Sequence, residues 1–312
     1  MSDMMVREQR ADCLHVELAG TAMRNPVLTA SGCFGWGREY SQYYPLHQLG
    51  GVCAKAVTEH PRDGNAVPRV TEVTAGMLNA IGLANPGLEE VLQSELPWLA
   101  SQDVCVWVNI AGAELEEYCS IAQAVAATNL AQVLELNVSC PNVKQGGLAF
   151  GTDPDVLKHL VAEVRGLVDM PLFVKLSPNV TDIRPLAEAA VEGGADGLTL
   201  INTLRGMAVD VANRRPILST VHGGLSGPAI KPVALSMVYQ VAKVVDVPIV
   251  GCGGIVSGQD ALEFIMVGAH AVQVGTANFT DPWAGPRIVS EIAAWMHQEG
   301  VRSLDEIRGS AL

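Results

Sequence analysis

Eight short apolar runs recur along the chain and set its predicted architecture. Each run is nearly continuous in hydrophobicity, whereas a strand with one face in water would alternate apolar and polar positions. Continuous runs of this length are typical of strands that are buried on both faces of a parallel sheet. The runs span residues 26–32, 51–58, 104–112, 133–141, 172–178, 197–203, 248–255 and 271–277.

Segments with helical periodicity lie between these runs. Their apolar residues recur at positions i, i+3 and i+4, which places them on one face of a helix. They span residues 88–101, 113–129, 153–168, 183–194, 232–245 and 257–269. Alternating strands and helices in eight units predict an α/β fold of the (β/α)8 TIM-barrel type. A doubly wound parallel sheet is the alternative.

Two of the gaps between the runs are long. Residues 59–103 follow the second predicted strand, and residues 204–247 follow the sixth. Both gaps begin on the face that carries the active site in such barrels, so we expect functional βα loops there. Residues 14–27 predict a short β-hairpin that plugs the bottom of the barrel. Since no linker or low-complexity tract divides the chain, residues 1–312 are predicted to form a single domain.

Composition narrows the class of function. The 312 residues include 20 Lys and Arg against 33 Asp and Glu, which gives a net charge of −13. Such an acidic chain is a poor candidate for binding nucleic acid or an anionic membrane surface. The sequence has no long apolar span, and the polar N-terminus has no secretory signal pattern. The seven cysteines are scattered without a CxxC pair, which predicts reduced thiols, a cytoplasmic protein and no metal site.

Polar side chains collect where the predicted strands end. In a parallel barrel these ends converge on one pocket, and a buried lysine or asparagine needs partners there. A ring of amides with two lysines suits a flat, hydrogen-bonding, partly anionic ligand. The alternative is that these residues only cap strands and order loops. They are Ser31, Lys55, Thr58, Asn109, Asn137, Ser139, Cys140, Asn142, Lys175, Ser177, Asn179, Asn202 and Thr203.

Glycine-rich segments provide a second indication of a ligand-binding site. There are three of them, and they span residues 222–232, 251–258 and 274–278. The last two follow the seventh and eighth predicted strands, where barrels often bind phosphate through backbone N–H groups. Glycine lets the backbone approach an anion closely, so these segments predict a phosphorylated ligand. The alternative is ordinary turns. Neither GxGxxG nor GxxxxGK(S/T) occurs, which argues against a dinucleotide-binding Rossmann site or a P-loop.

Cys140 ends the fourth predicted strand and has no histidine beside it in the sequence. A protease-like nucleophile normally relies on such a partner, so that role is disfavoured. A thiol can instead act as a general base, with a pKa that nearby positive charge lowers.

With these motifs the chain resembles the catalytic subunit of dihydroorotate dehydrogenase, the flavin enzyme of pyrimidine biosynthesis. The resemblance covers nearly the whole chain. It is carried by ASGCFG (30–35), CAKAVT (53–58), NAIGLANPG (79–87), NVSCPNVKQGG (137–147), VKLSPN (174–179), INT (201–203), GGLSGPAIKP (223–232), GCGGI (251–255) and VGTA (274–277). It implies a TIM barrel that binds FMN at the strand C-termini and oxidises (S)-dihydroorotate to orotate.

The resemblance also implies residue roles. Cys140 would be the base that takes the C5 proton, while the C6 hydride passes to flavin N5. Lys175 would lie against the flavin N1/O2 edge, and Lys55 would serve both the flavin and the substrate carboxylate. The implied FMN contacts are Ser31, Lys55, Ala56, Asn109, Asn137, Lys175, Ile201, Gly227, Gly253, Gly254, Gly275 and Thr276. The implied substrate contacts are Lys55, Asn79, Ala80, Ile81, Gly82, Leu83, Asn137, Asn142, Asn202 and Thr203.

Within that family the chain is most similar to the class 1 cysteine-type, NAD+-linked (1B) form. It has Cys140 where the membrane-linked, quinone-using class has serine, and it has no amphipathic N-terminal extension. The 1B form implies a homodimer joined by two partner subunits that carry FAD and an iron–sulfur (2Fe–2S) cluster, a heterotetramer. The alternative is the fumarate-dependent form, which acts alone. Departures such as Ala56 and Ala84 put no catalytic role in doubt.

Three alternative functions outside this family assignment stay open. One is a pyrimidine-reducing relative such as the FMN domain of dihydropyrimidine dehydrogenase, which shares the NxSCPN motif but belongs to a much longer chain. Another is a Schiff-base aldolase with Lys175 as the amine. The last is a catalytically silent barrel that serves as a binding module.

Overall fold

The computed structural model describes residues 13–139 and 150–312, and its centre is a closed barrel of eight parallel strands. The order around the barrel follows the chain, and the last strand pairs with the first. One strand comes from each apolar run, which confirms the predicted TIM barrel; the doubly wound alternative is wrong. The strands are β3 (Val27–Thr29), β4 (Gly51–Cys53), β7 (Cys105–Ile110), β8 (Val133–Asn137), β9 (Leu172–Lys175), β10 (Gly197–Leu200), β15 (Ile249–Cys252) and β16 (Ala271–Val274).

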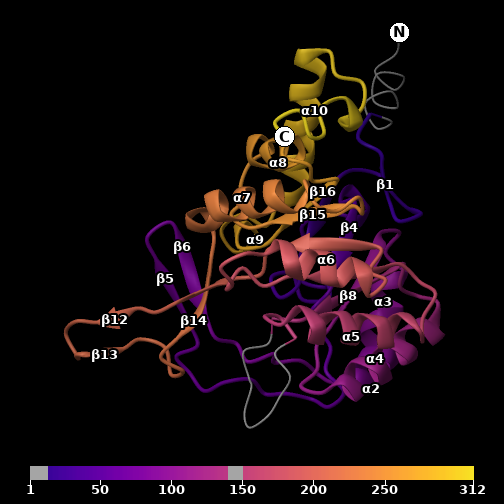
Figure 1. Ribbon diagram of the computed structural model, residues 1–312. Helices are drawn as coiled ribbons and strands as arrows, with labels where there is room; N and C mark the ends of the chain where they lie inside the picture. The colour runs from indigo at the N-terminus through magenta and orange to yellow at the C-terminus, as the bar shows by residue number, and fades with distance from the viewer. Residues whose placement is uncertain (1–12, 140–149) are drawn as a thin grey trace.

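Helices surround the barrel, as the periodicity predicted (Figure 1). The longer ones are α4 (Leu115–Thr128), α5 (Pro154–Arg165), α6 (Arg184–Glu192), α7 (Lys231–Val241), α8 (Gly258–Met266) and α10 (Ala284–Glu299). Residues 88–100 form α2 (Leu88–Glu90), the π-helical η3 (Val91–Glu95) and α3 (Leu96–Ala100). Short helices are η1 (Tyr40–Gln42), η2 (Leu46–Gln48), η4 (Pro228–Ile230), α9 (Ala277–Thr280) and η5 (Leu304–Glu306). None of the helices in the described ranges is long and apolar enough to cross a membrane.

Local sequence explains where the helices begin. The side chain of Asp153 accepts hydrogen bonds from the backbone N–H groups of Asp155 and Val156, which caps α5. Ser257 and Asp260 form a reciprocal capping box at the start of α8. Helix α10 lies beyond the segments that the periodicity predicted.

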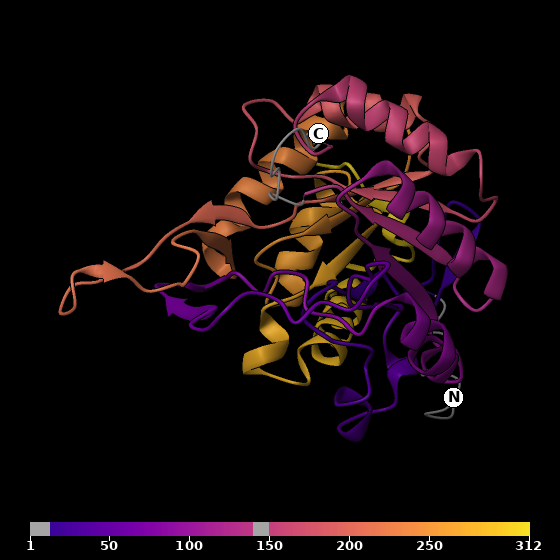
Figure 2. The same ribbon diagram turned by 90° about the horizontal axis from the view of Figure 1, so that it is seen from below.

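The two long gaps come together in one antiparallel sheet outside the barrel. Its order is β11 (Leu204–Gly206), β14 (Gly223–Ser226), β6 (Gly76–Asn79) and β5 (Val70–Val73). A small hairpin of β12 (Val209–Asp210) and β13 (Arg215–Pro216) extends further from the barrel (Figures 1 and 2). The gaps were predicted to hold functional loops, but the sheet that joins them was not predicted.

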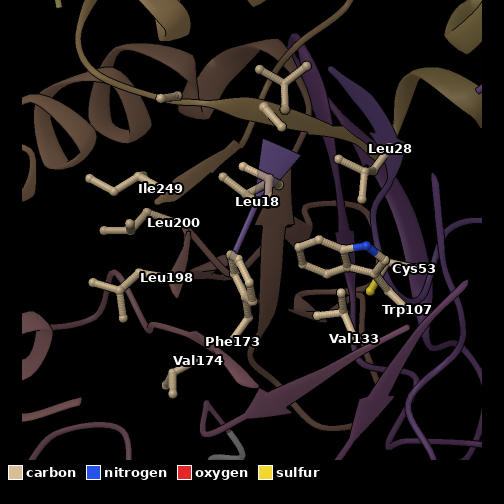
Figure 3. Close-up of a cluster of buried hydrophobic side chains, with 14 of the residues drawn as sticks. Leu18, Leu28, Cys53, Trp107, Val133, Phe173, Val174, Leu198, Leu200 and Ile249 are labelled. Carbon is tan, nitrogen blue, oxygen red and sulfur yellow. The ribbon is translucent and has the colours of Figure 1, made fainter. Parts of the chain in front are cut away.

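Side chains of the N-terminal hairpin pack with side chains of the barrel strands in one apolar cluster. The predicted hairpin consists of β1 (Val16–Leu18) and β2 (Thr21–Met23), which pair antiparallel. Figure 3 shows Leu18 within a cluster that includes Phe173 and Trp107, and Leu18 is fully buried. The rings of Trp107 and Phe173 lie 4.7 Å apart between centroids. The hairpin therefore supplies a side chain that fills this part of the barrel, as a plug would.

Candidate active site

Side-chain alternation along β8 divides the barrel interior into layers. Successive residues of a strand point to opposite faces, so Val133, Glu135 and Asn137 share one face. Val133 belongs to the apolar cluster of Figure 3. Glu135 makes its contacts with residues of four other barrel strands, so this face is the interior one. The interior therefore changes from apolar to polar between the start and the end of the strand.

The polar layer is centred on the carboxylate of Glu135, which is fully buried. Its Oε1 accepts a hydrogen bond of 2.7 Å from Asn109 Nδ2 and one of 3.2 Å from the Cys53 thiol. Its Oε2 accepts bonds of 2.7 Å from Thr199 Oγ1 and from Gln273 Nε2. Four donors thus satisfy the carboxylate. The sequence analysis missed Glu135, although a glutamate inside a continuous apolar run was a signal that could have found it.

Lys175 connects this layer to the open end of the barrel. It ends β9, is 4 % exposed, and donates from Nζ to Gln273 Oε1 at 2.9 Å. Burial opposes the ammonium charge, but Cys252 and Glu135 favour it, and the net effect raises the pKa of Lys175 above its ordinary value. Burial also raises the pKa of the Cys252 thiol, which is therefore neutral near pH 7. The carboxylate of Glu135, which accepts four hydrogen bonds, is linked to this ammonium through Gln273.

Lys175 also lines a pocket that opens at the C-terminal ends of the barrel strands. The strand ends and the β14 segment supply the walls. The lining residues are Ala30, Ser31, Cys33, Lys175, Ile201, Asn202, Thr203, Ser226, Gly227, Ile230, Cys252, Gly253, Gly254, Ile255, Val256, Gly275, Thr276 and Ala277.

Glycines after β15 and β16 form one rim of this pocket. Gly254 has φ +74°, and a Cβ there would lie 2.8 Å from the backbone nitrogen of Lys231. In the described part of the chain, no acceptor takes the backbone N–H groups of Gly254, Gly275 or Thr276. Unpaired N–H groups at strand ends are ready donors for an anion. This rim therefore fits a phosphate group.

The family model of dihydroorotate dehydrogenase matches residues 13–296. The chain belongs to this family. It is 52 % identical over 296 residues to the dihydroorotate dehydrogenase B (NAD(+)) catalytic subunit of Bacillus cytotoxicus, covering 95 % of this chain and 96 % of that one. The corresponding subunit of Geobacillus kaustophilus is 53 % identical, with 95 % of each chain covered.

A solved structure agrees in fold. The crystal structure of dihydroorotate dehydrogenase from Eimeria tenella in complex with ferulenol superposes with a TM-score of 0.79. The match covers 96 % of this chain and 88 % of that one, at 24 % sequence identity. At this identity the likeness supports the barrel fold alone.

Dihydroorotate dehydrogenases are FMN-dependent, and two thirds of the predicted FMN contacts meet in the pocket. Ser31, Lys175, Ile201, Gly227, Gly253, Gly254, Gly275 and Thr276 line it. Lys55, Ala56, Asn109 and Asn137 are not part of its lining. Asn109 instead joins the Glu135 layer, and its Oδ1 is buried with no partner among the described residues. A buried acceptor of this kind suits the N–H edge of a heterocycle.

The predicted substrate contacts divide into two groups. Asn202 and Thr203 line the pocket, and Asn202 Nδ2 donates to Asn137 Oδ1 at 3.1 Å, which joins β8 to the end of β10. Asn79 ends β6. Ala80, Ile81, Gly82 and Leu83 follow it in the loop between β6 and α2. These five residues are not part of the pocket lining. Cys140 and Asn142 lie outside the described residues.

Lys55 lies two residues after β4, and its Nζ comes close to Gly32, which lies between the pocket residues Ser31 and Cys33. Burial lowers its pKa, Cys33 opposes that effect, and Arg69 adds to it. No ion pair between described residues involves Lys55. A partly buried ammonium without a carboxylate partner suits an anionic group from outside the chain.

Gly254→Ala is expected to weaken FMN binding at least about tenfold, because the new methyl group meets the backbone of Lys231 and displaces the rim of unpaired N–H groups. Fluorescence titration of the apoprotein with FMN measures the dissociation constant. Gly300→Ala is the matched control, since Gly300 has a similar φ of +71° but open space around its Cβ position. Equal FMN affinity in both variants would show that this rim does not hold the cofactor.

Proposed function

We propose that this chain is the FMN-binding catalytic subunit of an NAD+-linked dihydroorotate dehydrogenase, which oxidises (S)-dihydroorotate to orotate in pyrimidine biosynthesis. The observation that carries the proposal is a buried ammonium, Lys175, in a pocket whose rim offers unpaired N–H groups, in a chain of this family. Charge and donors of this kind match an anionic heterocycle that bears a phosphate.

Each part of the pocket has a proposed task toward FMN. Gly253, Gly254, Gly275 and Thr276 would hold the phosphate through backbone N–H groups. When bound, FMN supplies a two-electron acceptor for the substrate hydride. The ammonium of Lys175, fixed by Gln273, offers a positive charge to the pocket without any rearrangement. The amides of Asn137 and Asn202, already joined to each other, would orient the substrate ring.

The proton leaves the substrate separately from the hydride. We assign its removal from C5 to the thiolate of Cys140, on the strength of the motif at residues 137–147 that follows β8. Lys55 would pair with the substrate carboxylate, which holds the ring in one orientation. A substrate without this carboxylate, such as a dihydropyrimidine base, would leave Lys55 without an anionic partner.

The relatives are named as catalytic subunits, which implies a further subunit. We propose that this partner carries FAD and a 2Fe–2S cluster and passes electrons to NAD+. The assembly would be a heterotetramer built on a homodimer of this chain, in the cytoplasm.

An acceptor assay tests this assignment. The purified chain is supplied with dihydroorotate and either fumarate or NAD+, with and without the partner subunit, and orotate formation is followed. We expect NAD+ reduction only when the partner is present, and no turnover with fumarate. Rapid turnover of fumarate by the chain alone would instead establish the fumarate-dependent form.

Lys55→Met is expected to raise the KM for dihydroorotate about 10- to 100-fold, the range for losing a charge-assisted hydrogen bond. The ammonium form binds the carboxylate, so affinity should fall as pH rises through the pKa of Lys55, which burial places below the ordinary 10.5. Lys55→Arg keeps the positive charge and should abolish this alkaline loss. Steady-state kinetics against pH measure both effects. A KM in Lys55→Met that equals the wild-type value would exclude the carboxylate contact.

A further inference from the structure

We propose that Glu135 is a positioning residue for the cofactor site, and that it holds the ammonium of Lys175 in place through the side-chain amide of Gln273. The inference rests on the FMN-dependent function proposed above. It concerns a residue inside the barrel that does not line the pocket.

The carboxylate of Glu135 is itself fixed in orientation. Four donors surround it, one each from β4, β7, β10 and β16, and each oxygen accepts two of the four bonds. Because each oxygen accepts two bonds, tilting the buried carboxylate out of its plane would break hydrogen bonds that nothing else replaces. The network therefore provides a rigid negative charge below the pocket.

Gln273 transmits this orientation to Lys175. Its Nε2 donates to Glu135 Oε2 at 2.7 Å, and its Oε1 accepts from Lys175 Nζ at 2.9 Å. In the flipped amide, the carbonyl oxygen would face the carboxylate and the NH2 group would face the ammonium. Both contacts would then be repulsive, so the carboxylate selects the amide orientation that gives Lys175 an acceptor.

The same carboxylate supplies the charge that Lys175 needs. The titratable groups that face Lys175 are Cys252 on β15, Glu135 on β8, Cys53 on β4 and Cys33 after β3. Burial raises the pKa of Cys33 to about 11 and raises the pKa values of Cys53 and Cys252 as well. These thiols are therefore neutral near pH 7, and the set's carboxylate is Glu135, whose two oxygens accept four hydrogen bonds. Without a countercharge, the pKa of a buried lysine can fall to about 6.

The Glu135→Gln holoprotein tests the inference through its flavin. Its FMN absorption spectrum and reduction potential are recorded from about pH 6 to about pH 10, because a charge change beside the ring alters both. We expect Glu135→Gln to show a titration step that the wild type lacks, where Lys175 loses its proton. The double variant Glu135→Gln/Lys175→Met should lack this added step, which would assign it to Lys175.

Matched variants separate positioning from a merely structural role. Thr199→Val removes one hydrogen bond to the carboxylate but keeps its charge, so its profile should match that of the wild type. Gln273→Met breaks the relay while both charges remain, so Lys175 should keep its proton, but its ammonium loses its fixed acceptor and the flavin potential should shift from the wild-type value. This variant decides the question if Glu135→Gln does not fold.

The outcomes are distinct. Glu135→Gln protein with full FMN content, no added titration step and the wild-type potential would overturn the inference, as would a wild-type potential in Gln273→Met. Wild-type protein that binds no FMN would instead overturn the proposed function on which the inference rests.

Discussion

Cys140→Ser is expected to leave FMN bound and to slow flavin reduction by dihydroorotate about 100- to 10,000-fold at neutral pH, the range for losing a general base. A serine hydroxyl is a far weaker acid than a thiol, so almost none of it is ionised where the thiolate would act. Because the hydride donor is activated by loss of the C5 proton, the defect should appear in the reductive half-reaction. Raising the pH should recover part of the rate.

Anaerobic stopped-flow absorbance measures this rate directly. Cys119→Ser on α4 is the control, since that cysteine lies on an outer helix and is not part of the pocket lining. It should reduce at the wild-type rate. If Cys140→Ser also matches the wild type across the neutral range, Cys140 is not the base.

Lys175→Met is expected to reduce its flavin about 100- to 1,000-fold more slowly, by analogy with the loss of one electrostatic donor in other active sites. The variant removes the positive charge that stabilises an anionic reduced ring, so its reduction potential should fall. It also leaves the Glu135 carboxylate without a countercharge and Gln273 Oε1 without its donor. We therefore expect weaker FMN binding as well.

FMN content, the dissociation constant and the equilibrium potential are the measurements for this variant. Lys243→Met, which removes a lysine beside Tyr239 at the end of α7, serves as the control. Unchanged flavin content together with an unchanged potential in Lys175→Met would remove Lys175 from the cofactor site.

The protonation of Lys175 also bears on the aldolase alternative. A Schiff base forms only from a neutral amine, and aldolases lower the pKa of the reacting lysine by burial or by nearby positive charge. Here the surroundings of Lys175 raise its pKa, and its Nζ is engaged with Gln273. The site therefore favours a fixed cation over a nucleophile.

The barrel could be predicted because its strands are buried on both faces, which leaves continuous apolar runs in the sequence. The outer sheet could not be predicted. Its strands are short and partly exposed, and β6 pairs with β14, so that Asn79 lies opposite Gly224 across a long stretch of sequence. Such pairing is set by tertiary packing and leaves no local periodicity.

Some residues of the candidate site could be predicted from the sequence and others could not, for a similar reason. Residues at the strand ends, such as Lys175 and Asn202, were found because all strand ends of a barrel converge. Glu135 and Gln273 were missed because each lies inside an apolar run, where the pattern indicates only a buried strand. Their role depends on which interior positions meet across the barrel, and that follows from register. The assignments of Cys140 and Asn142 remain predictions.

The central claim is tested most directly by an anaerobic visible spectrum of the purified chain, recorded before and after dihydroorotate is added. We predict a yellow protein with a flavin spectrum that bleaches when dihydroorotate is added, as orotate forms. A colourless protein that still binds no FMN after reconstitution would contradict the account, as would a bound flavin that dihydroorotate does not reduce.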